Sequence, residues 1–276
     1  MTEMFDRLFE AWPWERTPAV DRGTVAPMDV LEKDNKLIIR AALPGVKPED
    51  VILSPDAARA AGITSTTCFP RGNLAPEGSV VKSTAIDPGL LDEHGVYHKV
   101  GPARVFTSES EAVAAVKGQG DRPVRPGDIV VLIGRGPLGS GMEETYQLTS
   151  ALRYLSWGRE CAILTDARFS GVSTGACIGL IAPEALAGGP VGKLRDGDRI
   201  RIRIDTRRLE GSVDVVGDAD EAWSPETAAA KLAARPPHPD LRPDPLLPED
   251  TRLWAILQQC SGGPWSGCVF DLEKIR

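Results

Sequence analysis

The chain has 276 residues, of which 42% are hydrophobic, enough for a sizeable core in one large domain or two small ones. A formal net charge of −7 argues against a nucleic-acid-binding surface. No apolar run reaches the roughly 18 residues of a membrane span, and the acidic N-terminus lacks the apolar stretch of a secretory signal. We therefore expect a cytoplasmic protein that contacts no membrane.

Residues 27–51 contain two short β-like runs separated by the turn signal Asp34-Asn35. The second run and its continuation, KLIIRAALPGVKPEDV (36–51), resemble the opening of the α-crystallin domain of small heat-shock proteins. The remaining strands of that sandwich do not follow, and a few strands alone bury too little surface to be stable. We therefore expect residues 1–50 to be a truncated, poorly structured heat-shock-like segment.

Short helices and strands are expected over residues 54–160. A loop with four glycines, 134–141, precedes the last helix, and the free N–H groups of that helix N-terminus could dock an anionic group. The loop lacks the Gly-Lys-Ser/Thr ending of a phosphate loop. The expected helices span 54–62, 108–117 and 143–157, and the expected strands span 64–69, 79–84, 101–106 and 129–133.

The apolar run Cys161–Leu164 predicts a buried strand, and it is followed by the turn-forming stretch DARFSGVSTG (166–175). Ser170, Ser173 and Thr174 lie there with two glycines, which permit positive φ angles or a close approach to a ligand. A hydroxyl on such a turn can be aimed at a substrate. The alternative is that these side chains merely cap a polar strand-to-helix loop.

The rest of the chain predicts a β-rich region and then an arm. Arg199–Asp205 alternates isoleucine with arginine, which indicates a half-buried strand, and 209–216 is its expected partner. Asp196-Gly197 is a hairpin signal. Short helices are expected over 182–187, 225–234 and 251–259, and an extended proline-rich arm over 235–248. Strands interleaved with few helices favour a mixed α/β fold with a barrel-like β core flanked by helices.

Several motifs, in order, resemble the C-terminal part of the dihydroxy-acid and sugar-acid dehydratase family. The motifs are GNLAPEGSVVK (72–82), GPARVF (101–106), GMEETYQLTSAL (141–152), TDARFSGVSTGACIG (165–179) and PEALAGGPVGKLRDGD (183–198). ARFSGVSTGA and the tail EDTRLWAILQQCSGGPWSGCVFD (249–271) resemble the D-xylonate-type branch more than the branched-chain amino-acid enzymes. The resemblance implies a small β-barrel "swivelling" domain over 51–220, followed by the arm and C-terminal helix over 221–276.

The resemblance also implies a chemistry. Dehydrating a 2,3-dihydroxy acid requires a base for the proton on carbon 2 and a Lewis acid that helps the 3-hydroxyl to leave. In the family an iron–sulfur cluster is that Lewis acid, Mg²⁺ orients the acid, and a serine alkoxide is the proposed base. The serine carries over to Ser170. The glutamate of the family's Gly-Met-Pro-Glu carries over to Glu144, whose carboxylate suits Mg²⁺.

Two of the implied assignments, those of the glutamates and of Lys82, have alternatives. Glu143 replaces the family's proline, so either glutamate could be the ligand, or both could simply favour a helix N-terminus through the macrodipole. Ser173 and Thr174 are candidates to contact the substrate. Lys82 is either a partner for the substrate carboxylate or a solvated lysine.

The cysteines depart from the family. They are odd in number, lack disulfide-framework or CxxC spacing, and do not match the family's cluster ligands, which lie in an N-terminal domain. Their simplest interpretation is buried or free thiols. The cysteines are Cys68, Cys161, Cys177, Cys260 and Cys268.

The resemblance implies that the chain is a fragment of a hydro-lyase. The intact enzyme would convert a D-xylonate-type aldonate to a 2-keto-3-deoxy acid, and we expect the fragment alone to be inactive. The expected partners are the small-molecule sugar acid and either a second copy of the chain or the missing N-terminal dehydratase domain. The alternatives are a chaperone-like module acting through the heat-shock-like segment and a plain oligomerisation module.

Overall fold

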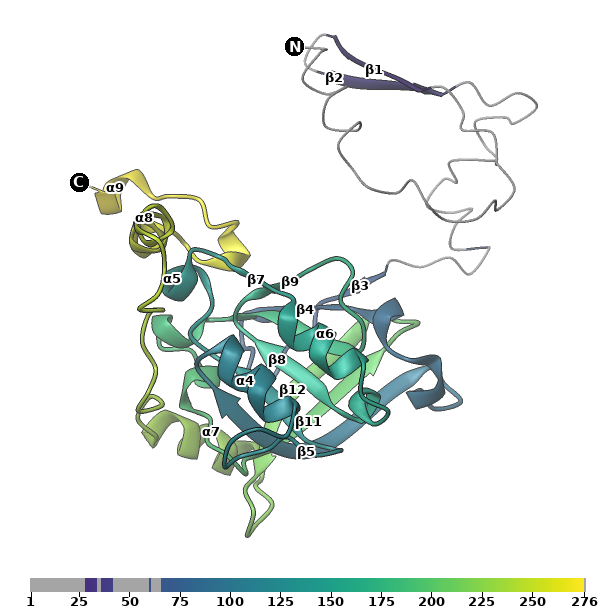
Figure 1. Cartoon of the computed structure of the whole chain (residues 1–276), viewed down its shortest axis with the longest axis vertical. Helices are drawn as coiled ribbons and strands as arrows, with labels where there is room; N and C mark the ends of the chain where they lie inside the picture. The colour runs from purple at the N-terminus through teal and green to yellow at the C-terminus, as the bar shows by residue number, and fades with distance from the viewer. Residues whose placement is uncertain (1–27, 34–35, 42–59, 61–65, 276) are drawn as a thin grey trace. The chain divides into compact units, whose positions relative to one another are not determined.

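The computed structural model describes residues 28–33, 36–41, 60 and 66–275 (Figure 1). The chain divides into two compact units between Ile63 and Thr64. In the first unit β1 (Met28–Lys33) and β2 (Lys36–Ala41) pair antiparallel, which confirms the two strands expected on either side of the turn signal. The likeness to an α-crystallin domain and the predicted domain boundaries stay predictions. The helix expected over 54–62 lies outside the described residues except for Ala60.

The second unit is built on an eight-stranded sheet that curls into a nearly closed barrel, with strand order β12-β11-β5-β6-β8-β10-β4-β3. The two edge strands meet around Arg71: its N–H donates to the Gly211 carbonyl over 3.2 Å, and the Val213 N–H donates to the Arg71 carbonyl over 3.0 Å. The predicted mixed α/β, barrel-like fold is therefore confirmed. The strands are β3 (Thr67–Cys68), β4 (Gly78–Lys82), β5 (Val96–Phe106), β6 (Ile129–Leu132), β8 (Ala162–Thr165), β10 (Ala176–Ala182), β11 (Arg199–Asp205) and β12 (Glu210–Gly217).

The middle of the sheet is parallel, and this positions the loops discussed below. β5 pairs antiparallel with β11 over residues 96–102 and then parallel with β6 over residues 103–106, so it is longer than the strand expected at 101–106. β6 pairs parallel with β8, and β8 with β10. Because the carboxyl ends of parallel strands share one edge, the loops that follow β6 and β8 leave the sheet side by side.

Two hydrophobic clusters cover the two faces of these parallel strands. Alternate residues such as Ile129, Val131 and Leu164 face the barrel interior, where the isoleucines of β11 are fully buried. Val130 and Ile163 belong to the second cluster, which lies under α4 and α6. Burial on both faces explains why β6 and β8 read as unbroken apolar runs, whereas β11 alternates as expected.

The helices lie outside the barrel, with α4 and α6 on the same face of the sheet (Figure 1). Ser108 caps α4, and Ser224 with Pro225 starts α7, which has the predicted bounds. Residues 235–248 contain no helix or strand, in agreement with the expected arm, and α8 packs on α5. None of the described helices reaches the length and hydrophobicity that a bilayer crossing requires. The helices are α4 (Glu109–Val116), α5 (Pro137–Ser140), α6 (Gln147–Arg153), α7 (Pro225–Ala234), α8 (Glu249–Leu257) and α9 (Leu272–Ile275), with 3₁₀ turns at 83–85, 88–90, 158–160, 185–187, 190–193, 258–260 and 264–266.

The helix expected to start at Glu143 was placed wrongly. Met142 has a φ of 74°, and Glu144–Thr145 forms the two-residue strand β7, so α6 starts only at Gln147. Neither Glu143 nor Glu144 therefore lies in the first turn of a helix, and the macrodipole explanation for this pair is wrong. The glycine loop therefore does not lead directly into α6, whose Leu148 N–H donates to the Glu109 carboxylate over 3.0 Å, and the docking of an anionic group at this helix N-terminus stays a prediction.

Two smaller expectations were also wrong, and one strand was missed. Asp196-Gly197 forms a turn that leads into β11 and joins no two strands, since the hairpin loop lies between β11 and β12. The helix expected over 182–187 is a single 3₁₀ turn at Ala185–Ala187. β10 follows the hydroxyl-rich turn, where no strand was expected.

Candidate functional site

Two of the motifs are joined by a short strand pair. β7 pairs parallel with β9 (Arg168–Phe169), with Glu144 opposite Arg168. The Arg168 Nε donates to the Met142 carbonyl over 3.1 Å, and its guanidinium lies 3.6 Å from the Glu144 carboxylate. Ser170 follows the paired segment directly. The structure therefore brings the turn that carries Glu144 and the turn that carries Ser170 to the same strand pair.

Ser170 is half-buried and lines a cavity of about 170 Å³. Lys82, Arg168 and Ser173 line the same cavity, together with residues of β4 and β10. The Ser170 hydroxyl accepts a long hydrogen bond, 3.5 Å, from the Val172 N–H. Ser170 is therefore accessible from this cavity, whose lining combines the polar side chains above with apolar residues such as Val80, Phe169 and Leu180.

Lys82 and Ser173 both have partners that hold the turn. The Lys82 ammonium, at the end of β4, donates to the Gly171 carbonyl over 3.1 Å. The Ser173 side chain is buried, and its hydroxyl lies 3.4 Å from the Thr149 hydroxyl of α6. Lys82 is therefore an exposed cation on the cavity wall, and Ser173 fixes the turn against α6.

Thr174 lies apart from the other candidates. It is exposed and lines a different cavity, of about 280 Å³, together with Arg153, Arg159 and Cys161. Among the residues singled out from the sequence, the structure therefore groups Lys82, Ser170 and Ser173 on one cavity. Glu144 approaches it through Arg168, and Thr174 does not line it.

Asp166, the first residue of the turn, is fully buried and was not singled out from the sequence as a structural anchor. Its carboxylate accepts hydrogen bonds from the backbone N–H groups of Gly134 (3.0 Å), Arg135 (2.9 Å) and Ala185 (3.0 Å). Burial raises the pKa of the Asp166 carboxyl, and these amide donors offset part of that effect. One carboxylate thereby ties together the loops that follow β6, β8 and β10. The sequence signal that could have identified Asp166 is its position directly after the buried strand β8.

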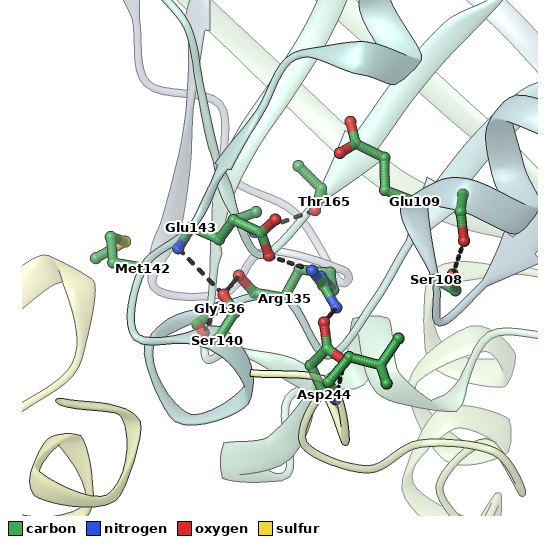
Figure 2. A network of polar contacts seen from close by, with 12 residues as sticks. Ser108, Glu109, Arg135, Gly136, Ser140, Met142, Glu143, Thr165 and Asp244 are labelled. Carbon is green, nitrogen blue, oxygen red and sulfur yellow. Dashed lines mark hydrogen bonds and ion pairs between the residues drawn. The ribbon is translucent and has the colours of Figure 1, made fainter. Parts of the chain in front are cut away.

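Arg135 joins a second polar network around the same loops (Figure 2). Its side chain is almost fully buried, and its guanidinium pairs with the carboxylates of Glu143 and Asp244. The Ser140 hydroxyl donates to the Arg135 carbonyl over 2.6 Å and accepts from the Glu143 N–H over 3.1 Å. Glu143 is thus held by Arg135, whereas the carboxylate of the exposed Glu144 has only the longer contact with Arg168 among the interactions above.

Glu184 is a second buried acid near this edge, at 2% exposure. Burial, together with the charge of Asp166, raises its pKa from 4.5 to about 8, although the Leu138 N–H donates to its carboxylate over 3.0 Å and opposes the shift. Glu184 is therefore largely protonated at neutral pH. Its carboxyl group also lies where a Cβ atom on Gly136 would be, so position 136 has no room for a side chain.

The described residues fit Mg²⁺ only in part and do not fit an iron–sulfur cluster. Glu144 offers an accessible carboxylate, the ligand type that Mg²⁺ prefers, but within 66–275 no three His, Cys, Asp or Glu side chains are grouped as a metal site. All five cysteines are free. Burial raises the pKa of Cys68 and Cys161 to about 11 and that of Cys177 to about 12, which disfavours the thiolates that a cluster needs.

Comparison with known proteins identifies the family to which the chain belongs. Residues 54–238 match the family model described as dihydroxy-acid/6-phosphogluconate dehydratase C-terminal. The chain is 59% identical over 231 residues to D-xylonate dehydratase YagF of Escherichia coli (strain K12), which is 84% of the chain and 35% of that protein. It is 57% identical over 232 residues to D-xylonate dehydratase YjhG of the same organism, 83% of the chain and 35% of that protein.

A more distant relative matches a shorter part of the chain. The dihydroxy-acid dehydratase of Aquifex aeolicus (strain VF5) is 46% identical over 140 residues, which is 50% of the chain and 24% of that protein. The chain thus spans about a third of the length of the two D-xylonate dehydratases that it matches.

Proposed function

Because the chain belongs to the dihydroxy-acid/6-phosphogluconate dehydratase family through that family's C-terminal domain, we propose that it forms one side of a sugar-acid dehydratase site. The proposed reaction removes water from a D-xylonate-type aldonate to give a 2-keto-3-deoxy acid in the cytoplasm. The names of the two E. coli relatives support this choice of substrate.

The observation that carries the proposal is the β7–β9 pairing, which sets Glu144 opposite Arg168, two residues before Ser170, although Glu144 and Ser170 are 26 residues apart in sequence. Ser170 Oγ, as the alkoxide, takes the proton from carbon 2 of the acid. The electrons of that C–H bond form the carbon 2–carbon 3 double bond as hydroxide leaves carbon 3, and the hydroxide takes the proton from the Ser170 hydroxyl to become water, which regenerates the alkoxide. The resulting enol tautomerises to the 2-keto acid. A serine hydroxyl is a very weak acid, so it can act as a base only beside a strong cation. Glu144 supplies a carboxylate ligand for Mg²⁺, which orients the substrate and stabilises the alkoxide when bound.

The other residues on the cavity have binding roles in this proposal. Lys82 provides a positive charge for the substrate carboxylate, and Arg168, which was not singled out from the sequence, adds a second cation on the same wall. Ser173 contacts the substrate or, through Thr149, keeps the turn in place. Thr174 can reach the substrate only if the turn rearranges, because it faces the neighbouring cavity.

Departure of the 3-hydroxyl requires a Lewis acid that the described cysteines do not provide. We therefore propose that an N-terminal dehydratase domain, as part of a longer chain or as a separate polypeptide, completes the site. The chain alone would then turn over no D-xylonate.

The test is complementation with a separately produced N-terminal part of a D-xylonate dehydratase such as YagF. We expect no turnover by the 276-residue chain alone and turnover in the mixture. In the mixture Ser170→Ala should lose about 10²- to 10⁴-fold in rate, the usual contribution of a general base. Ser150→Ala on α6 is the matched control and should keep its rate. Turnover by the chain alone, or full activity of Ser170→Ala, would contradict the proposal.

A further inference from the structure

We propose that Arg135 is a positioning residue that clamps Glu143 to Asp244, so that the proline-rich arm fixes the turn presenting Glu144 to its cation. The clamp follows from contacts within the chain. Only the identity of the cation site rests on the proposed function above.

The clamp starts from a rigid point at the end of β6. Gly134 has a φ of 75°, and its N–H and that of Arg135 both donate to the buried Asp166 carboxylate. The Arg135 backbone is therefore anchored independently of its side chain. From this anchor the guanidinium lies between two carboxylates and uses a different terminal nitrogen for each, as Figure 2 shows.

Asp244 is held by the arm itself. Its N–H donates to the Gly139 carbonyl over 3.0 Å, and its second carboxylate oxygen accepts from the Leu246 N–H over 2.9 Å. The Asp244 side chain is only 16% exposed. The arm thus delivers a prearranged carboxylate to Arg135, and a buried guanidinium of this kind is costly to leave without its partner.

On the other side, Glu143 is fixed at two points. Its carboxylate pairs with Arg135, and its N–H donates to the Ser140 hydroxyl, which itself donates to the Arg135 carbonyl. The next residue, Glu144, then enters the strand pair with Arg168. Because Glu143 and Glu144 are adjacent, holding the first restricts where the second can place its carboxylate.

A planar guanidinium is suited to this position. It can direct separate N–H groups at two carboxylates at once, whereas an ammonium is a single point charge on a flexible stem. The two partners lie far apart in the sequence, since Asp244 is 109 residues from Arg135 and Glu143 only 8. The clamp therefore couples a distant arm to the turn beside the site.

The test uses the whole chain without metal and compares Asp244→Asn with Asp240→Asn. Both variants remove one negative charge from the same arm, but the exposed Asp240 makes no contact with Arg135 among the described interactions. Amide hydrogen exchange is measured for residues 143–145, which Asp244 does not touch directly. We expect Asp244→Asn to raise their exchange rate about tenfold, the effect of losing one charge-assisted hydrogen bond, and Asp240→Asn to leave it unchanged.

A second readout is Mn²⁺ affinity, with Mn²⁺ as the probe for the cation. Asp244→Asn should weaken Mn²⁺ binding several-fold, and the conservative Asp244→Glu should restore both the affinity and the slow exchange. If Asp244→Asn does not fold, Glu143→Gln provides the same comparison from the other side of the clamp.

The outcomes separate the two proposals. Unchanged exchange at 143–145 in Asp244→Asn, or an equal increase in Asp240→Asn, would overturn the clamp. Absence of Mn²⁺ binding in the unmodified chain would contradict the metal role of Glu144, while the exchange data would still decide whether the clamp exists.

Discussion

At the scale of single residues, the two adjacent glutamates show how position separates similar side chains. Glu143 is bound by Arg135, and Glu144 lies on the exposed side of the same turn opposite Arg168. The sequence left their roles open because both are acidic and neighbouring. The ion pair with Arg135 and the pairing of β7 with β9 distinguish them, and both contacts depend on the folded chain.

The buried acid Glu184 leads to a prediction about pH. Its pKa in the folded chain is about 8, above the ordinary 4.5, so the native state binds more protons than the unfolded state between these values. The free energy of unfolding should therefore fall as the pH rises from about 4.5 to about 8. Glu184→Gln cannot ionise and should flatten this dependence in urea titrations at several pH values.

The control for this prediction is Glu210→Gln, which removes an exposed carboxylate at the start of β12. It should keep the slope of the unmodified chain. An unaltered slope in Glu184→Gln would show that another group causes the pH dependence.

A second prediction at this scale concerns the barrel core. Ile202 is fully buried among the inward-facing residues of β11. Ile202→Ala should lower the free energy of unfolding by about 2–5 kcal/mol, because it removes buried methyl groups and leaves a cavity. The neighbouring outward-facing Arg201→Ala should cost less than about 1 kcal/mol, as expected for an exposed ion pair. Denaturant unfolding of both variants measures this, and equal losses would contradict the inward and outward assignment.

At the scale of elements, the sequence predicted those helices and strands whose signals lie within their own residues. The alternation in Arg199–Asp205 predicted β11, and the helix-like stretch 225–234 predicted α7, because both signals lie within the element itself. The start of α6 was wrong because β7 is stabilised by a strand that lies more than twenty residues further along the chain. Arg135 was missed because its partner Asp244 lies in a different part of the sequence.

The hydroxyl-rich turn supports a prediction about its two glycines. Gly175 has a φ of 94°, so a side chain there would strain the backbone. Gly171 has no positive φ, and a Cβ atom added to it would meet no other atom within 4 Å. Gly175→Ala should destabilise the chain by about 1–3 kcal/mol, and Gly171→Ala should be nearly neutral. Thermal unfolding of the pair tests this, and the reverse order would show that the turn adopts a different conformation.

At the scale of the whole molecule, the nearly closed barrel acts as a support for loops at one edge. The parallel strands β6 and β8 end there, and Asp166 and Arg135 hold the loops that follow them. A barrel-like core could be predicted because strands were frequent and helices few. The links that the Asp166 carboxylate and the Arg135 guanidinium make between these loops could not be predicted, because their partners are distant in sequence.

Cation binding should also be visible in the stability of the whole chain. A ligand that binds only the folded state raises the free energy of unfolding, by about 2.7 kcal/mol at a hundred times its dissociation constant. Mg²⁺ should therefore raise the melting temperature of the unmodified chain, and Glu144→Gln should reduce that rise more than Glu77→Gln. Equal shifts in both variants would place the cation elsewhere.

The most direct test of the central claim, that Glu144 and Ser170 border one site, is paramagnetic broadening of backbone amide resonances by Mn²⁺. We predict that the amide signals of residues 144 and 170 broaden together at low Mn²⁺, that those of β12 stay sharp, and that Glu144→Gln abolishes the effect. Broadening of residue 144 without residue 170, or broadening that survives in Glu144→Gln, would contradict the claim.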